Sequence, residues 1–193
     1  MFYLIRHGET ILPKGICIGQ KDVPLAEKGI TSIMQNTLPK LRAFQLEQPR
    51  IIASPLQRTM KTAQILATEY GVDVTPEPNI LEINMGEWDG LSFNFIKTNW
   101  PEAYKLRGVD FTHFRPPEGE SFFDVQQRAL KAVLPLCQLT EPVLLVTHAG
   151  VIRTLLCLAN QTPLQELFTY DPAPGSITRL RKRVFLETAL QLN

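Results

Sequence analysis

Three short, mainly apolar runs divide the chain: FYLI at residues 2–5, RIIAS at 50–54 and VLLVTH at 143–148. Each run is bounded by a polar or turn-forming residue, and continuous apolar runs of this length are typical of strands buried on both faces. The second and third runs lead directly into segments with helical spacing, at residues 55–70 and 150–160. This alternation predicts an α/β fold, a three-layer α/β/α sandwich whose central sheet is mostly parallel and carries helices on both faces.

Capping and turn-forming residues predict where the helices begin and end. Ser54 is expected to cap the free amides of the helix at 55–70, with Pro55 in the first turn, where its missing N–H does no harm. The first strand leads into an irregular segment rich in Pro and Gly, so its helix is expected to begin near Leu25. Pro39 is expected to end or kink that helix.

The last third of the chain predicts one more helix and a pair of strands. Ser121 and Asp124 have the spacing of a capping pair, and a helix is predicted from there to about Cys137. The tail SITRLRKRVFLETALQL, residues 176–192, predicts two strands around a turn near 181–183.

The segment from Pro76 to Gly119 has a weaker pattern, because prolines and aromatic residues interrupt it. A partly helical insertion at about 76–119 is expected to pack over one end of the sheet. Its aromatic side chains suit an apolar leaving group such as a benzimidazole or a nucleoside, but such residues are more often the packing core of an insertion. No repeat, low-complexity tract or linker marks a boundary, so residues 1–193 are expected to form a single domain.

Charge and composition narrow the classes of function. Lys and Arg number 20 against 19 Asp and Glu, which gives no electrostatic basis for a nucleic-acid or membrane partner, so anion binding has to be local. Cys17, Cys137 and Cys157 lack the close pairing of zinc sites or redox dithiols and are expected to be reduced and mostly buried. No signal peptide or membrane span is evident, and a cytoplasmic protein is expected.

Candidate chemistry lies at the ends of the three predicted strands. The first ends at Arg6 and His7, the second leads to Arg58, and the third ends at His148. Each residue alone fits an ordinary structural role, as part of a solvated loop, a surface cation or a core histidine. In a parallel sheet, however, the carboxyl ends of strands meet at one edge, and such a cluster repels itself unless it surrounds an anion. Phosphate fits best, since Arg offers a planar fork of donors for its oxygens, and no metal is needed.

Five motifs carry a resemblance to a known family: RHGET, ASPLQRTMKTAQILA, LEINMGEWDG, PPEGES and VTHAGVIR, which stand in this order over most of the chain. Together they resemble the histidine phosphatase superfamily, also called phosphoglycerate mutase-like. The resemblance implies that His7 is the nucleophile that becomes phosphohistidine. It also implies that Arg6, Arg58 and His148 hold the phosphate oxygens.

A proton donor is implied by the same resemblance. Glu82 aligns with the acid of the family motif, and Glu87 and Asp89 are rivals within a few residues. Such a set has a coherent chemistry. A neutral imidazole nitrogen attacks phosphorus in line, the cations stabilise charge on the equatorial oxygens, and the leaving alkoxide takes the proton of the acid.

The motifs favour a phosphatase over a mutase. Where the mutases resemble ERHYG and HGNSLR, this chain has EINMG and HAGVIR, without polar groups that would grip a phosphoglycerate. The loop LPKGICIGQKDVPL, residues 12–25, is similar to that of α-ribazole phosphatases, which makes Gly19 and Gln20 candidates for substrate binding. Ile18 and Lys21 stand where that branch usually has tyrosine and threonine.

The resemblance therefore implies a cofactor-independent phosphomonoesterase that hydrolyses α-ribazole 5′-phosphate to α-ribazole and phosphate, in assembly of the nucleotide loop of cobalamin. The expected partner is a small-molecule phosphomonoester, and the oligomeric state stays open, with a homodimer as one option. Three alternatives also stay open: a broad phosphatase of sugar phosphates or nucleotides, a phosphoglycerate mutase, and a non-catalytic phosphate-binding scaffold.

Overall fold

A five-stranded sheet lies at the centre of the computed structural model, which describes residues 1–191. Its strands are β1 (Phe2–Arg6), β2 (Arg50–Ala53), β3 (Val74–Pro76), β4 (Val143–Thr147) and β5 (Ile177–Leu180), in the spatial order β3-β2-β4-β1-β5. Strands β1 to β4 pair in parallel, and β5 runs antiparallel to β1 at the edge. The three strands predicted from the apolar runs are confirmed.

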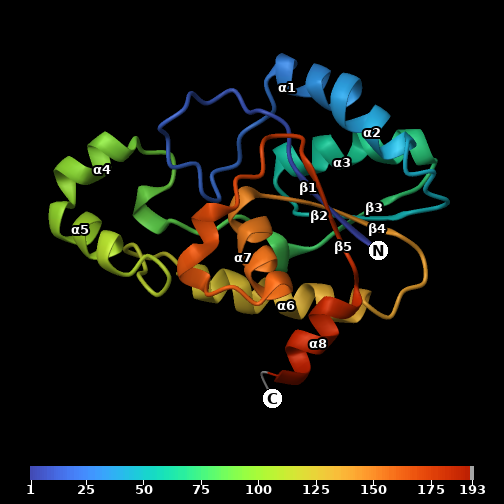
Figure 1. Cartoon of the computed structure of the whole chain (residues 1–193). Helices are drawn as coiled ribbons and strands as arrows, with labels where there is room; N and C mark the ends of the chain where they lie inside the picture. Colours follow the sequence, from blue (N-terminus) through green and yellow to red (C-terminus); the bar gives the residue numbers. More distant parts are fainter. Residues whose placement is uncertain (192–193) are drawn as a thin grey trace.

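Helices cover both faces of this sheet (Figure 1). One face carries α1 (Glu27–Ser32), α2 (Leu38–Arg42) and α3 (Gln57–Tyr70), and the other carries α6 (Phe122–Leu136), α7 (Ala149–Asn160) and α8 (Arg183–Gln191). Alternate side chains of β1 enter two separate cores, Tyr3 and Ile5 on one side, Phe2 and Leu4 on the other, as the two-residue period of a strand requires. The predicted three-layer α/β/α sandwich is confirmed.

The start of α3 differs from the prediction. Ser54 does not cap the helix, because the helix begins only at Gln57 and the Ser54 hydroxyl bonds to His148 Nε2 over 2.7 Å. Leu56 occupies the N-cap position without a side-chain bond. The amide of Gln57 is satisfied instead by the carboxylate of Asp22 over 2.8 Å, so a distant loop supplies the cap.

Pro39 does not end the first helical segment. The helix begins at Glu27, close to the predicted start, widens into a π-helical turn, η1 (Ile33–Thr37), and continues as α2 beyond the proline. In this turn the N–H of Leu38 bonds to Ile33 O, so Pro39 lies in the first turn of α2, where a missing N–H is tolerated.

The two predictions for the last third of the chain had different outcomes. Helix α6 has the predicted capping box, with Ser121 and Asp124 bonded to each other's backbone amides. The predicted second strand of the tail is wrong: α8 follows β5 and buries Phe185 against Phe2, with ring centroids 5.6 Å apart. Packing against the helical layer overrides the alternation of the sequence here, and Leu192, at the end of the expected strand, lies outside the described residues.

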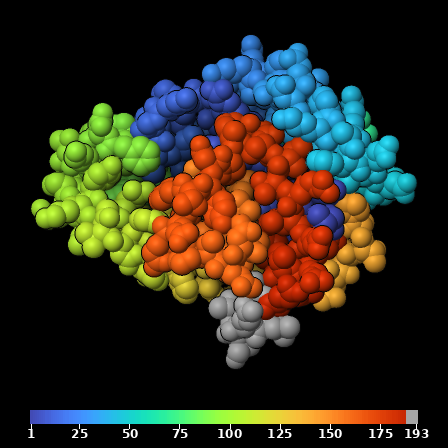
Figure 2. Space-filling view, viewed as in Figure 1, coloured from blue at the N-terminus to red at the C-terminus, as the bar shows by residue number. Residues whose placement is uncertain are grey.

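The insertion contains two 3-10 turns, η2 (Pro78–Ile80) and η3 (Gly86–Trp88), and two helices, α4 (Phe93–Asn99) and α5 (Pro101–Val109). It forms one end of the molecule beyond the carboxyl ends of β1 and β4, and in the space-filling view it adjoins the blue N-terminal loop and the orange segment that includes α7 (Figures 1 and 2). A further 3-10 segment, η4 (Leu164–Thr169), follows α7. The insertion is thus partly helical, as predicted.

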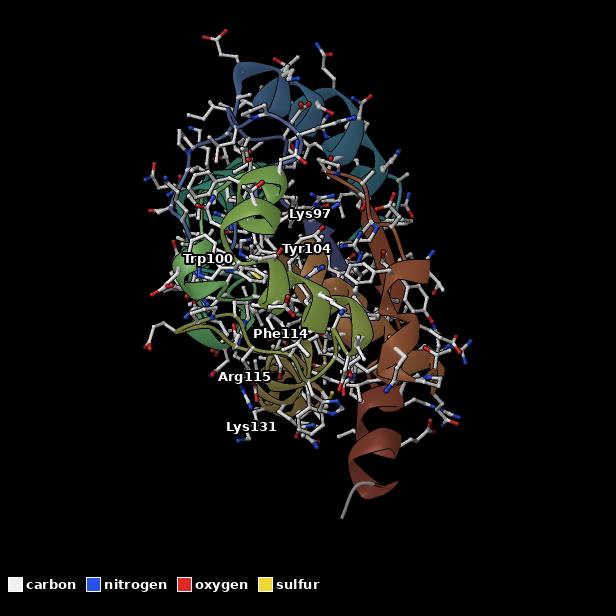
Figure 3. All side chains as sticks on the ribbon, turned by 90° about the vertical axis from the view of Figure 1, so that its left-hand side faces the viewer. Lys97, Trp100, Tyr104, Phe114, Arg115 and Lys131 are labelled. Carbon is white, nitrogen blue, oxygen red and sulfur yellow. The ribbon has the colours of Figure 1, made fainter. Side chains whose placement is uncertain are left out.

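The aromatic side chains of the insertion mainly form its own core. Trp88 is fully buried, and the rings of Tyr104 and Phe114 lie 6.5 and 5.6 Å from it, centroid to centroid. Trp100 also packs against this core, and Figure 3 looks onto this side of the molecule. Packing therefore explains most of these aromatics, as the alternative interpretation held. Among residues 1–191, no helix combines the length and the apolar character that a bilayer crossing requires.

Candidate active site

The four predicted residues Arg6, His7, Arg58 and His148 meet at the carboxyl edge of the sheet. Arg6 ends β1 and His7 follows it, Arg58 lies in the first turn of α3, and His148 follows β4 as the N-cap of α7. The N–H of His7 donates to Thr147 O over 3.0 Å, which fixes the ends of β1 and β4 in register. The two imidazole rings lie 5.1 Å apart, centroid to centroid.

The position of the proton on His7 follows from one hydrogen bond. Its Nδ1 lies 2.7 Å from the carbonyl oxygen of Gly8, and because a carbonyl only accepts, Nδ1 carries the proton. His7 is 6% exposed, and burial together with the cations Arg58 and Arg6 lowers the pKa of His7 to about 3, against the opposing effect of the Gly8 bond. His7 is therefore neutral at physiological pH, with the lone pair of Nε2 free.

Two guanidinium groups flank this imidazole, and the carboxylate of Glu82 acts on both from beyond ion-pair distance. Arg6 donates from Nη1 to Pro172 O over 2.8 Å, and Arg58, which is 1% exposed, donates to the carbonyls of Gly19 and Lys21 over 2.7 and 2.8 Å. Within residues 1–191 neither Arg forms an ion pair, and the Nε atom of each is buried without a hydrogen-bond partner. Burial lowers the pKa of both guanidinium groups. An anion among them would remove this cost.

His148 is fully buried beside His7 and bonded to Ser54. Its Nε2 lies 2.7 Å from Ser54 Oγ, while its Nδ1 is buried without a hydrogen-bond partner in the described chain. Burial lowers the pKa of His148 well below its ordinary value, and the neighbouring His7 adds to that effect. A neutral His148 with its proton on Nδ1, accepting from Ser54 through Nε2, can donate to an oxygen of a bound anion.

Glu82 lies at the same edge, in the part of the insertion between η2 and η3 that adjoins the start of α7. Its Oε1 accepts from the amide of Ile83 over 3.0 Å and its Oε2 from the amide of Gly150 over 3.4 Å. A Cβ at position 150 would lie 2.3 Å from Glu82 Oε1, so a larger residue there would displace the carboxylate. Of the two rivals, Glu87 is exposed, and Asp89 is engaged as an acceptor from the amides of residues 20 and 85. Only Glu82 of the three lines the cavity next to His7.

Gly19 and Gln20 lie on the loop that Arg58 holds. Gly19 lines the cavity and has φ +49°, and a Cβ on it would lie 1.6 Å from a carboxylate oxygen of Asp89. Gln20 is not among the residues that line the cavity; its Nε2 donates to the main-chain carbonyl of Glu82 over 2.9 Å. Gly19 therefore lies at the cavity, whereas Gln20 contacts the main chain of Glu82.

Comparison with known proteins identifies the family. Residues 2–184 match the histidine phosphatase superfamily, branch 1. The chain belongs to this superfamily.

Two relatives and one solved structure illustrate the range of similar proteins. The Escherichia fergusonii protein named probable phosphoglycerate mutase GpmB is 38% identical over 159 residues, 80% of this chain and 72% of that protein. The 6-phosphofructo-2-kinase/fructose-2,6-bisphosphatase of Arabidopsis thaliana is 32% identical over 169 residues, 85% of this chain but 22% of the much longer relative. The α-ribazole phosphatase structure from Shigella flexneri has a TM-score of 0.82 and 25% identity, over 91% of this chain and 87% of that one.

The cavity of this superfamily member contains side chains that the sequence analysis did not single out. Its volume is about 310 Å³, and beside the residues above it is lined mainly by apolar groups, among them Ile16, Ile18, Phe93, Phe122 and Phe168. Phe122 and Phe168 come from outside the insertion, on α6 and η4. No sequence pattern distinguishes such residues from ordinary core positions.

Two further arginines line this cavity. Arg153, on α7, donates to Tyr170 O and to the carboxylate of Asp171, and its guanidinium lies 5.3 Å from the centre of the Phe168 ring. Arg107, on α5, forms no side-chain hydrogen bond or ion pair with residues 1–191. Arg153 stands three residues after Gly150, on the same face of the helix, so the VTHAGVIR motif held a signal for it. Arg107 lies in the weakly patterned insertion, which gave none.

The thiol of Cys17 also faces this cavity, and burial raises its pKa to about 12, so it stays protonated. All three cysteines are free, with Cys17 and Cys157 buried and Cys137 half-buried, which confirms the expectation. Among the described residues no group of three His, Cys, Asp or Glu side chains has the arrangement of a metal site.

Proposed function

We propose that this protein is a phosphomonoesterase that acts through a phosphohistidine at His7. The observation that carries the proposal is a neutral imidazole, its Nδ1 committed to Gly8 and its Nε2 free, flanked by Arg6 and Arg58, which form no ion pair within residues 1–191. A phosphoryl dianion supplies the missing negative charge, and Nε2 supplies the nucleophile.

The reaction runs in two steps. First, Nε2 of His7 attacks phosphorus, the bond between phosphorus and the ester oxygen breaks, and the carboxyl of Glu82 gives its proton to the leaving alkoxide. Then water attacks the phosphohistidine, the P–N bond breaks, and the Glu82 carboxylate takes a proton from the water. Phosphate leaves, and both side chains return to their starting states.

We infer α-ribazole 5′-phosphate as the substrate. The loop at residues 12–25 resembles that of α-ribazole phosphatases, and the fold is similar to such an enzyme from Shigella flexneri. The cavity gives physical support, since its apolar lining, with Phe93, Phe122 and Phe168, suits a benzimidazole ring. Ile18 lines the cavity where a stacking tyrosine is usual in that branch, so contact with the ring rests on the three phenylalanines.

One observation favours a second class of substrate. Arg107 faces the cavity without a partner for its guanidinium in the described chain, and a leaving group with its own carboxylate or phosphate would supply one. Phosphorylated sugars and sugar acids have this chemistry, and the relatives named for phosphoglycerate and fructose 2,6-bisphosphate belong to that class. The α-ribazole leaving group carries no anionic group for Arg107.

The covalent intermediate is tested with p-nitrophenyl phosphate labelled in its phosphoryl group, in the presence of EDTA. The reaction is quenched rapidly in acid or in base, and the label that stays on the protein is compared. We expect an acid-labile, base-stable phosphoenzyme in the parent and none in His7→Ala. If His7→Ala still becomes labelled, His7 is not the nucleophile. A parent that binds phosphate tightly by calorimetry yet shows no turnover would be a non-catalytic scaffold.

The substrate class is tested by kcat/KM on α-ribazole 5′-phosphate, 3-phosphoglycerate, fructose 2,6-bisphosphate and mononucleotides. We expect α-ribazole phosphate to lead, and Arg107→Gln to leave it within about threefold of the parent. If an anionic substrate leads and Arg107→Gln lowers its kcat/KM by tenfold or more, about 1.4 kcal/mol, the second class is correct.

A further inference from the structure

The main-chain carbonyl of Glu82 accepts hydrogen bonds from two side chains that approach it from different parts of the fold. Gln20 Nε2 donates to it over 2.9 Å and Arg128 Nη2 over 3.0 Å. Gln20 belongs to the loop after β1, and Arg128 to the middle of α6. Neither residue lines the cavity beside His7, so their contact with the site runs through the backbone of the acid.

The backbone around Glu82 is irregular and is held by contacts on either side of the acid: the amides of Asn84 and Met85 donate to the carboxylates of Glu120 and Asp89, whereas the carbonyl of Glu82 itself depends on Gln20 and Arg128. Residues 81–85, here called the acid loop, lie between the turns η2 and η3 and belong to no helix or strand. The carboxylate itself is held loosely, since one of its two amide contacts is 3.4 Å long. A proton donor has to lie within hydrogen-bond reach of the leaving oxygen, so the placement of this acid depends on what holds the acid loop.

Arg128 braces the acid loop at more than one point. Its Nη1 donates to Asn79 O over 2.9 Å, and its Nε and Nη2 form two bonds to the carboxylate of Glu120, over 3.0 and 2.7 Å. Glu120 in turn accepts from the amide of Asn84 over 2.8 Å. The side chains of Arg128 and Glu120 are 18% and 19% exposed, so water has little access to the two hydrogen bonds between them.

Gln20 joins the acid loop to the phosphate-binding side of the site. The residues on either side of it, Gly19 and Lys21, offer their carbonyls to Arg58, while its own N–H donates to Asp89 over 3.0 Å. Its side chain therefore spans from the loop held by Arg58 to the carbonyl of Glu82. One residue thus links the group that would bind the phosphoryl oxygens to the group that would protonate the leaving oxygen.

We propose that Gln20 and Arg128 are positioning residues that hold Glu82 in place as the proton donor, and this rests on the role given to Glu82 under the proposed function. Gln20 then acts on the acid and not on the substrate. The two residues matter for leaving groups that need a proton and much less for those that depart as stable anions, because only the former use Glu82 in the step that breaks the ester bond.

The experiment compares p-nitrophenyl phosphate, whose leaving group departs as a stable phenolate, with β-glycerophosphate, whose alkoxide needs a proton. We expect Arg128→Met and Gln20→Met to lower kcat/KM for β-glycerophosphate by about tenfold or more, and for p-nitrophenyl phosphate by less than about threefold. Arg128→Lys, which keeps the charge and a single donor nitrogen, should recover part of the loss. Vanadate should inhibit the variants at nearly the parent's concentration.

Controls separate this proposal from a general loss of structure. Arg42→Met removes another doubly bonded Arg–Glu pair, with Glu69 on the surface, and should leave both substrates unchanged. If Arg128→Met fails to fold, Gln20→Met alone decides, since it removes one side-chain bond and no buried ion pair. Equal losses on the two substrates in the folded variants overturn the positioning role.

Glu82→Gln separates the proton-donor role of Glu82 from the positioning role of Gln20 and Arg128. If kcat/KM for β-glycerophosphate falls selectively in this variant but not in the Gln20 and Arg128 variants, the positioning proposal fails, and Glu82 remains the proton donor. If Glu82→Gln affects both substrates equally, Glu82 is not the proton donor, and the positioning proposal fails with it. Phosphohistidine formation at His7 remains a separate measurement in either case.

Discussion

At His7 a single hydrogen bond to the neighbouring carbonyl decides which nitrogen can react. The bond from Nδ1 to Gly8 O leaves Nε2 unprotonated, and burial beside Arg58 keeps the ring neutral far below the usual pKa of an imidazole. The same burial costs stability in acid. In the unfolded chain the imidazole binds a proton near pH 6.5, whereas in the folded chain it does so only near pH 3.

The pH dependence of unfolding should therefore reveal His7. Between these two pKa values the unfolded state binds more protons, so stability falls as pH falls, by about 1.4 kcal/mol per pH unit. From pH 6 to pH 4, in buffers free of phosphate, we expect the parent to lose about 2 kcal/mol more than His7→Asn, which can still donate to Gly8. Urea unfolding at each pH measures this, and parallel curves for the two proteins would contradict it.

The secondary-structure elements differ in where their end groups find partners. Helix α6 carries its own signal, since Ser121 Oγ donates to the Asp124 carboxylate over 2.7 Å and accepts from the Asp124 amide over 3.2 Å. Helix α3 has no such cap, and its first amide, that of Gln57, depends on Asp22 from another segment. Local sequence thus defines the start of α6, and tertiary contact defines the start of α3.

Ser121→Ala tests how much the α6 cap contributes. Removing the hydroxyl leaves the N3 amide unbonded, and we expect the free energy of unfolding to fall by about 1 kcal/mol, up to about 2. Ser92→Ala is the matched control, because Ser92 caps the short α4 in the insertion, away from the sheet, and should cost less. Urea denaturation of both variants measures the difference, and no loss of stability in Ser121→Ala would mean that packing holds the start of α6 without its cap.

The molecule as a whole is arranged so that strand ends, loop and insertion enclose an electropositive site. The edge of the sheet brings together Arg6, His7, Arg58 and His148, and helices on both faces fix those strands. The insertion, visible at one end of the molecule in Figure 2, adds Phe93 and Arg107 to the cavity. Folding therefore buries cations that a bound anion would stabilise.

Inorganic phosphate should accordingly raise the thermal stability of the whole chain. At a hundred times its Kd, a ligand that binds only the folded state adds about 2.7 kcal/mol to the free energy of unfolding, equivalent to roughly 5–10 °C in Tm for a chain of this size. We expect this shift in the parent and in Arg42→Gln, but not in Arg58→Gln, measured by calorimetry as the difference with and without phosphate. A similar shift from chloride at equal ionic strength would point to general screening.

Sequence patterns were most informative where structure depends on local order. The three buried strands, the capped helix beginning after Ser121 and the strand-end cluster of Arg6, His7, Arg58 and His148 were all predictable, because apolar runs, capping spacing and the geometry of parallel sheets are readable along the chain. The tail was not. Its residues suit strand or helix, and burial of Phe185 against Phe2 selected the helix.

The sequence by itself determined the order of strands and helices and the residue types that reach the carboxyl edge of the sheet. Tertiary structure alone decided the contacts among them. Ser54 bonds to His148 and does not cap its own helix, Gln20 reaches the carbonyl of Glu82, and Arg107 faces the cavity. The reason is physical: polar groups pair with whichever partners folding brings within hydrogen-bond distance, and those partners come from segments far apart along the chain.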